Sequence, residues 1–204
     1  MIVAQWITAA AVAGSWSEPK PYALPVLNVT LIAVNGQTSA VASAGLIGGM
    51  RLRYRDQPHW LSNTRASLIG SYGLLSQSLG ADLRVGSFLG PSGSLFTYQL
   101  GPDVWYDGYG REGASDYWLP WSPGVDLHNE LTFHPIREIS LVGEATPGWA
   151  FAASRQDGGV GPFHELTLSA LVVLRTPVIG LTVGYTRQYR SFGTYDGLIL
   201  SGAL

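Results

Sequence analysis

The residues with the clearest capacity for chemistry lie between positions 126 and 144. Ionisable and hydroxyl side chains occupy most of the even positions there, and a turn at Pro135 divides them into two runs. Strand side chains alternate between two faces, so a hairpin over residues 125–145 would place all of them on one face. The set is Asp126, His128, Glu130, Thr132 and His134, followed by Glu138, Ser140 and Glu144.

Two kinds of catalytic or metal chemistry can be weighed on this face. A Ser–His–acid arrangement from Ser140, His128 and either Glu130 or Glu138 would indicate a barrel enzyme that modifies lipids, but any barrel with polar walls supplies such a trio and no motif supports it. His128 and Glu130 would lie roughly 6.5–7 Å apart along the strand, and His134 about 20 Å from His128, too far to share a metal ion. We therefore expect no catalytic site, no metal and no cofactor.

A second charged group is built from arginines. In the stretch GLIGGMRLRYR the odd positions end in Arg51, Arg53 and Arg55, while Leu46, Met50 and Leu52 occupy the even positions. One face of this strand is therefore apolar and the other carries guanidinium groups. If the apolar faces point outward, one wall of a barrel interior becomes basic and another acidic, so the walls either neutralise each other across the lumen or form a charged constriction. The predicted lumen charges are Arg51, Arg53, Arg55, Arg65, Arg84, Asp126, Glu130, Glu138 and Glu144.

Composition decides which way the apolar faces point. Charged residues make up 13% of the 204 residues, against roughly 25% in an ordinary soluble domain. No segment offers the roughly 20 successive apolar residues of a transmembrane helix. Twenty-six glycines, seven tryptophans and ten tyrosines suit closely spaced strands and a membrane–water boundary. A net charge of −2 argues against a nucleic-acid partner, and the absence of cysteine excludes a disulfide framework.

Alternation predicts an all-β chain with about 10–12 strands, although 8 are possible. The clearest hairpin joins residues 163–175 to 178–190 through Thr176-Pro177, with Leu166, Leu168, Val172 and Leu174 on one face. Further strands are expected at 24–35, 39–55, 60–74, 81–89, 94–100, 125–134, 136–145, 149–154 and 195–204. Residues 1–14 are either a first strand or the remnant of a leader. The whole chain, 1–204, is expected to form a single domain.

Residues 101–124 break the rhythm and predict a long loop rich in aromatic residues, glycine and proline. Such a loop either packs its aromatic side chains at the membrane interface or binds a sugar or protein partner. The aromatic side chains are Trp105, Tyr106, Tyr109, Tyr117, Trp118 and Trp121.

With tight turns at Thr176-Pro177, at Pro135 and at 90–93, and one long loop, the chain resembles bacterial outer-membrane β-barrel proteins. The resemblance implies a closed antiparallel transmembrane β-barrel in the bacterial outer membrane, surrounded by the lipid bilayer. It also implies a small pore for solutes, or a structural envelope protein that binds a protein partner. A lipid-modifying barrel enzyme and a soluble β-barrel that binds an apolar ligand are the alternatives.

Overall fold

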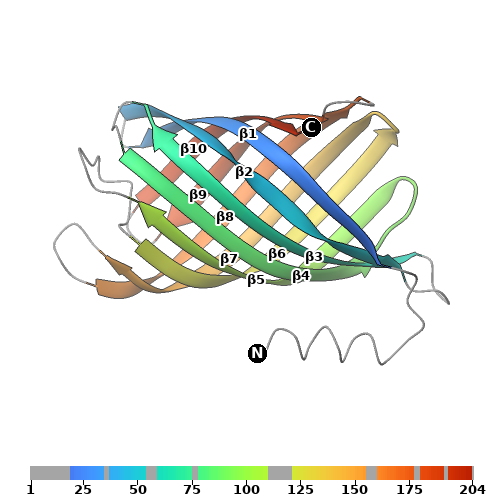
Figure 1. Ribbon diagram of the computed structural model, residues 1–204, viewed down its shortest axis with the longest axis horizontal. Coiled ribbons are helices and arrows are strands. Elements are labelled where there is room, and N and C mark those ends of the chain that lie inside the picture. Colours follow the sequence, from blue (N-terminus) through green and yellow to red (C-terminus); the bar gives the residue numbers. More distant parts are fainter. Residues whose placement is uncertain are drawn as a thin grey trace.

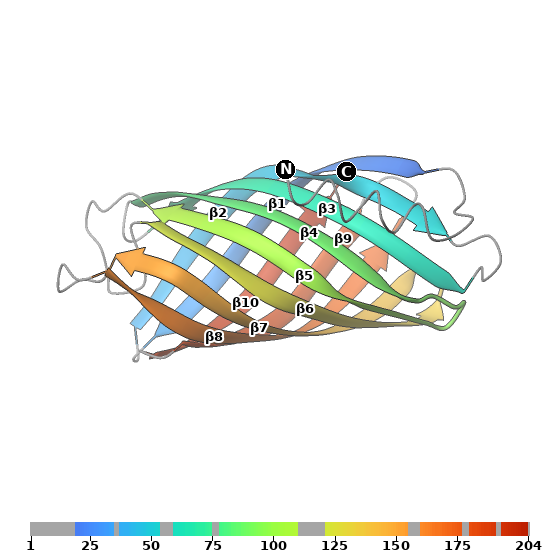
Figure 2. The same ribbon diagram turned by 90° about the horizontal axis from the view of Figure 1, so that it is seen from below.

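The computed structural model describes residues 19–34, 37–53, 59–74, 78–109, 121–154, 160–176, 180–190 and 193–203. These residues form ten antiparallel strands that close into a barrel (Figures 1 and 2), which confirms the predicted fold and the lower end of the predicted strand count. The strands are β1 (Lys20–Val34), β2 (Gln37–Arg53), β3 (Trp60–Gly73), β4 (Ser78–Pro91), β5 (Phe96–Tyr109), β6 (Trp121–Ile136), β7 (Ile139–Ser154), β8 (Val160–Arg175), β9 (Gly180–Arg190) and β10 (Gly193–Ala203). No helix among the described residues is long and apolar enough to cross a membrane.

Each strand pairs with its neighbours in the chain, and β1 pairs with β10 to close the sheet. We call the end where β1 begins the terminal end; it also holds the tight β6–β7 connection between Ile136 and Ile139. The opposite end, which we call the loop end, holds the β5–β6 connection over residues 110–120. Short connections at the terminal end and a long one at the loop end are typical of outer-membrane barrels.

The outward face of the barrel is a belt of aliphatic side chains. Leu46, Leu68 and Leu83 are direct register partners on β2, β3 and β4, and their exposed fractions are 61%, 59% and 46%. A similar row crosses the other side of the barrel through Leu141, Val172, Val183, Leu200 and Val29, each exposed by 40% or more. Leucines that cover the outside of a closed sheet gain burial only against acyl chains, so this belt faces lipid.

The sequence-based orientation of the hairpin over β8 and β9 is confirmed. Leu166, Leu168, Val172 and Leu174 all point outward and are exposed. Toward the loop end the belt gives way to tyrosines and to an outward ion pair in which Arg187 Nε lies 2.6 Å from Asp196 Oδ1. Tyrosine and charged groups at this height mark the boundary between lipid and water.

Two segments that the sequence predicted to interrupt strands are themselves parts of strands. Residues 101–109 were predicted in a loop but belong to β5, and the separate strands predicted at 136–145 and 149–154 form the single strand β7. Proline and glycine suggested turns in both places. The barrel accommodates Pro102 and Pro147 within strands because the ladder is interrupted on one side of each: β4–β5 pairing jumps from Gly86–Asp103 to Leu89–Leu100, and β6–β7 pairing jumps from Asp126–Gly148 to Asn129–Ala145. A residue in such a gap has no ladder partner for its backbone N–H. A proline, which has no N–H, can therefore lie there without the loss of a hydrogen bond.

Candidate functional site

The lumen contains a cavity of about 380 Å³ lined by residues from all ten strands. Its walls differ around the barrel. Strands β8, β9, β10 and β1 contribute mainly small neutral groups, namely Thr167, Thr186, Gly197 and Thr30, together with Gln188 and with Asp196, which is paired with Arg187. Strands β3 to β7 contribute arginine, aspartate, histidine and glutamate, namely Arg65, Asp82, Arg84, Asp103, His128 and Glu144. The open space is therefore bounded by several charged groups on one side and mainly by neutral groups on the other.

The lumen arginines are neutralised along the barrel wall, by acids on their own strand or two strands away. Arg84 on β4 lies 3.0 Å from Asp82 on the same strand and 3.6 Å from Asp126 on β6. Arg65 on β3 lies 3.9 Å from Asp103 on β5. Of the pairing predicted between the arginine wall and the acidic wall, the structure shows Arg84 with Asp126, and the other acids that contact these arginines are Asp82 on β4 and Asp103 on β5. Charges this deeply placed need near neighbours as partners, because desolvation penalises a charge whose partner is remote.

Acidic groups outnumber arginines in this part of the lumen. Among the described inward-facing residues beyond the terminal mouth there are seven acids, Asp82, Asp103, Asp107, Asp126, Glu130, Glu144 and Glu165, and two arginines, Arg65 and Arg84. Two positive charges against seven negative ones leave a formal charge of −5 when every carboxylate is ionised. The predicted interior positions of Arg65, Arg84, Asp126, Glu130 and Glu144 all fall in this region.

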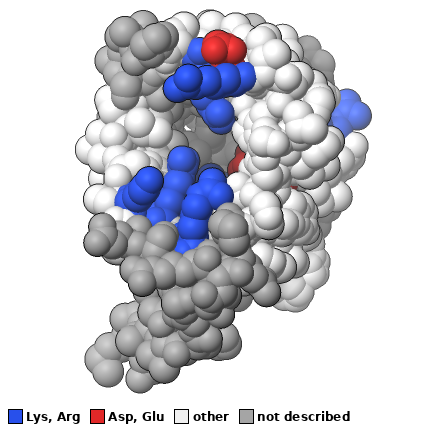
Figure 3. All heavy atoms as spheres, turned by 90° about the vertical axis from the view of Figure 1, so that its right-hand side faces the viewer, with Lys and Arg blue, Asp and Glu red and all other residues white. Residues whose placement is uncertain are grey.

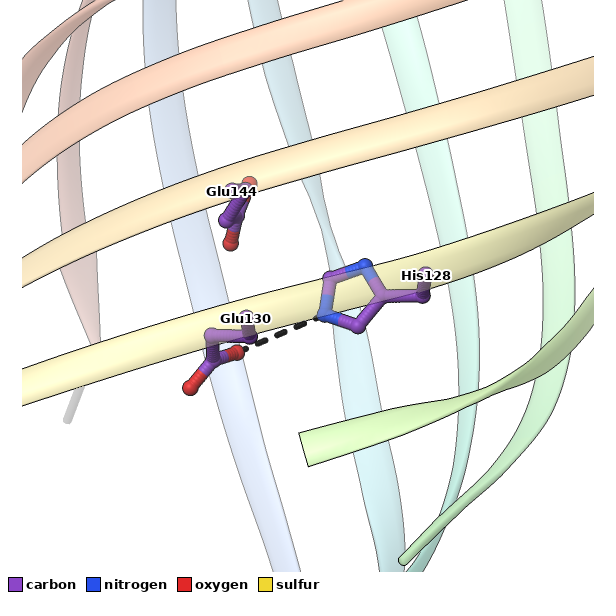
Figure 4. A group of neighbouring side chains, drawn as sticks. All are labelled: His128, Glu130 and Glu144. Carbon is purple, nitrogen blue, oxygen red and sulfur yellow. Dashed lines mark hydrogen bonds and ion pairs between the residues drawn. The ribbon is translucent and has the colours of Figure 1, made fainter. Parts of the chain in front are cut away.

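His128, Glu130 and Glu144 form a compact group on adjacent strands (Figure 4). One potential ligand atom from each residue lies within 4.8 Å of the others, and His128 Nε2 is 3.5 Å from Glu130 Oε2. Glu130 and Glu144 are direct partners in the β6–β7 register. The His128 side chain is 8% exposed, and its ring packs edge-on against Phe88 with 4.9 Å between ring centroids.

The trio of His128, Glu130 and Ser140 that would form an enzyme site is not assembled. Ser140 is fully buried, and its Oγ lies 2.8 Å from Nδ1 of His134, not from His128. The other ring nitrogen of His134 lies 3.4 Å from Thr97 Oγ1, so within the described part of the chain both ring nitrogens contact hydroxyls and not an acid. The alternation of strand side chains correctly predicted that these residues share one face. Ser140, however, lies beside His134, and His134 is six residues, or about 20 Å, along β6 from His128.

The mouth at the terminal end is basic. Figure 3 looks into this end and shows Lys and Arg side chains around a hollow. Arg51 lies over the Tyr22 ring at 4.8 Å, and Arg53 is exposed on the next inward position of β2. The exposed cations that the topology places at this end are Lys20, Arg51, Arg53, Arg137 and Arg175. Arg55 lies outside the described residues, as do residues 1–14.

Glu138 was predicted in the lumen but lies exposed in the two-residue β6–β7 turn. Its even position matches the inward face of β7, which begins one residue later at Ile139. Alternation between two faces holds only for residues within a strand, and Glu138 lies in the turn.

Trp105 was predicted in an interfacial loop but is buried in the lumen. It is 1% exposed and packs with Ala150 and Phe163, and its indole covers Gly124. Tyr106, the next residue, points outward and is 46% exposed. Tyr117 and Trp118 lie outside the described residues, and Tyr109 and Trp121 are described only as the ends of β5 and β6.

The sequence did not predict the lumen positions of Asp107 and Glu165, nor that of Asp103. Because residues 101–124 were taken as a loop, its pairing with Arg65 could not be anticipated. A period-two signal was present, since Gly101, Asp103, Trp105 and Asp107 alternate with Pro102, Val104 and Tyr106.

No protein-family model matches the chain, and no curated protein sequence matches it significantly. Solved structures with a similar course include a bacterial polysaccharide outer membrane secretin, with 8% identity, a TM-score of 0.39, and coverage of 88% of this chain and 97% of that one. The Pseudomonas putida toluene transporter TodX is 13% identical with a TM-score of 0.40, over 94% of this chain and 71% of that chain. The outer membrane channel DcaP of Acinetobacter baumannii is 11% identical with a TM-score of 0.33, over 87% and 62%. The assignment itself comes from the closed sheet and its outward apolar belt: the chain is an antiparallel transmembrane β-barrel of the outer-membrane type.

Proposed function

We propose that this protein is a small pore of the bacterial outer membrane whose charge-lined lumen favours cations over anions. The observation that carries the proposal is the cavity of about 380 Å³, which touches all ten strands and lies behind an open, basic mouth (Figure 3). Narrow barrels are commonly filled by their own side chains, so an open cavity of this size favours a path for solutes.

Selectivity follows from the fixed charges along the path. The excess of acids over arginines in the mid-lumen lowers the energy of a small cation there and raises that of an anion, since a ring of acidic groups selects for cations. The basic mouth draws anions only to the entrance. Small hydrophilic cations and zwitterions are therefore the expected solutes.

The test is conductance in a planar bilayer. The refolded protein should give discrete current steps, and a KCl gradient should give a reversal potential of the sign expected for cation preference. Both measurements should be made in EDTA, so that no divalent ion occupies the lumen. A barrel that runs as a folded, heat-modifiable band on a gel yet gives no current steps overturns the pore.

A substitution on the wall formed by β8, β9, β10 and β1 tests whether this wall lines the route of the conducted ions. Thr186→Arg on β9 places a cation against the cavity and should reduce conductance and shift the reversal potential toward anions. Thr194→Arg at the exposed, loop-end start of β10 is the matched control and should leave both unchanged. Equal behaviour of the two variants contradicts the proposed path.

A further inference from the structure

Glu130 and Glu144 create a local electrostatic problem on the inward face of β6 and β7. They face each other as direct register partners, which places their Cβ atoms about 4.5–5.5 Å apart. Carboxylates on directly opposed residues destabilise each other unless a cation or a proton lies between them. The arginines of the lumen bind Asp82, Asp103 and Asp126 instead.

His128 adds a nitrogen ligand to the pair. Its Nε2 lies 3.5 Å from Glu130 Oε2, and one ligand atom from each of the three residues falls within 4.8 Å of the others (Figure 4). A tetrahedral metal with bonds of about 2.0–2.2 Å separates its ligand atoms by roughly 3.3–3.6 Å. The His–Glu spacing already has this value, and the Glu144 ligand atom lies within 4.8 Å of the other two.

Two threonines hold the potential ligands in position. The Oγ1 of Thr146 lies 3.4 Å from His128 Nδ1, so Nδ1–H can donate to it and leave the Nε2 lone pair free for a metal. The hydroxyl of Thr132 donates to Glu130 Oε1 at 2.9 Å, which leaves Oε2 on the side of the histidine. Partners that fix the tautomer and the carboxylate orientation are characteristic of metal sites.

A separate observation comes from Gln99, the register partner of Glu130 on β5. Gln99 is 7% exposed, and its amide nitrogen Nε2 is buried without a hydrogen-bond partner. A water or hydroxide held by a metal ion between the glutamates would give this amide the acceptor it lacks. The cavity reaches His128 and Glu144, so solvent can occupy the remaining coordination position.

We infer that His128, Glu130 and Glu144 form a binding site for a first-row divalent metal ion of the zinc class, open to the lumen. One imidazole and two carboxylates match the mixed nitrogen–oxygen sets that bind Zn²⁺ with an open position. The sequence predicted no metal because it considered only residues of one strand, whereas Glu144 comes from the neighbouring strand.

The decisive measurement is Zn²⁺ binding to the full chain, refolded in detergent without a polyhistidine tag and stripped with EDTA. Competition with a chromophoric chelator should give one Zn²⁺ per chain at pH 7, and the affinity should fall as the pH is lowered, because protons compete with the metal for its ligands. Co²⁺ should give the visible absorption of a low-coordinate site. Absence of stoichiometric binding to the folded wild-type chain overturns the inference without any variant.

Variants then assign the ligands. His128→Gln and Glu144→Gln should each weaken Zn²⁺ binding by at least 100-fold, and Thr146→Val by about 10-fold. The matched controls are His164→Gln, on the outer face, and Glu138→Gln, in the β6–β7 turn, which should bind as the wild type does. Unchanged affinity in both ligand variants, with heat-modifiable gel mobility intact, refutes the assignment. Since binding is measured in detergent, a failed pore and a failed metal site give separate results.

Discussion

Leu68→Arg tests the lipid-facing belt most directly. Leu68 lies eight residues from the start of β3 and five from its end, which at 3.3 Å per residue and a tilt of about 40° places it roughly 20 Å and 13 Å from the two ends. It is 59% exposed, and its register partners are Leu46 and Leu83, so an arginine there has no polar neighbour. An arginine near the middle of the hydrocarbon layer costs about 2–4 kcal/mol. The folding equilibrium should fall about 30- to 700-fold.

The assay is reversible denaturant unfolding of the barrel in lipid vesicles, followed by tryptophan fluorescence and gel mobility. Leu79→Arg is the control, because Leu79 is even more exposed, at 68%, but is the second residue of β4 and lies at the loop-end rim. An arginine at the rim extends into the headgroups and should cost about 0–1 kcal/mol. Equal costs for Leu68→Arg and Leu79→Arg would refute the placement of this belt in lipid.

Two further substitutions probe the interior and the sheet. Trp105→Ala should lower the free energy of unfolding by about 3–5 kcal/mol and raise single-channel conductance, because it removes a fully buried indole from the lumen; unchanged stability in a denaturant titration would contradict its packing role. Gly101→Ala should lower the free energy of unfolding by about 1–3 kcal/mol or more, because the new Cβ would collide with the backbone carbonyl of Ser87 and lie 2.8 Å from Phe88 Cα. The matched Gly202→Ala meets nothing within 4 Å and should change the stability by less than about 0.5 kcal/mol, so similar costs at both glycines would rule out the close strand approach at Gly101.

Alternation along single strands predicted most of the fold. Leu166, Leu168, Val172 and Leu174 share a face by period two, and the structure places them all toward lipid. The failures came where glycine and proline were taken as turn residues. Pro102 and Pro147 stay within strands because the ladder is open beside them, and that gap depends on the neighbouring strand, which single-strand patterns do not describe.

The site was predictable only in part for the same reason. Parity correctly pointed Arg84, Asp126 and Glu144 inward, but the partner of each charge is set by register between strands. Arg84 reaches Asp126 across β5, and Glu130 meets Glu144 across one ladder, so the ion pairs run around the barrel wall. Pattern within a strand carries no information about which residues of two strands lie side by side.

The two halves of the lumen wall are subject to different evolutionary constraints. The charged half, on β3 to β7, holds interlocked ion pairs such as Arg84 with Asp82 and Asp126, so a change there disturbs several partners at once. The half formed by β8, β9, β10 and β1 presents Thr167, Thr186, Gly197 and Thr30, none of which is part of those ion pairs. Drift or design could therefore widen or narrow the bore through this half by exchanging side-chain size alone, while the fixed charges remain as they are.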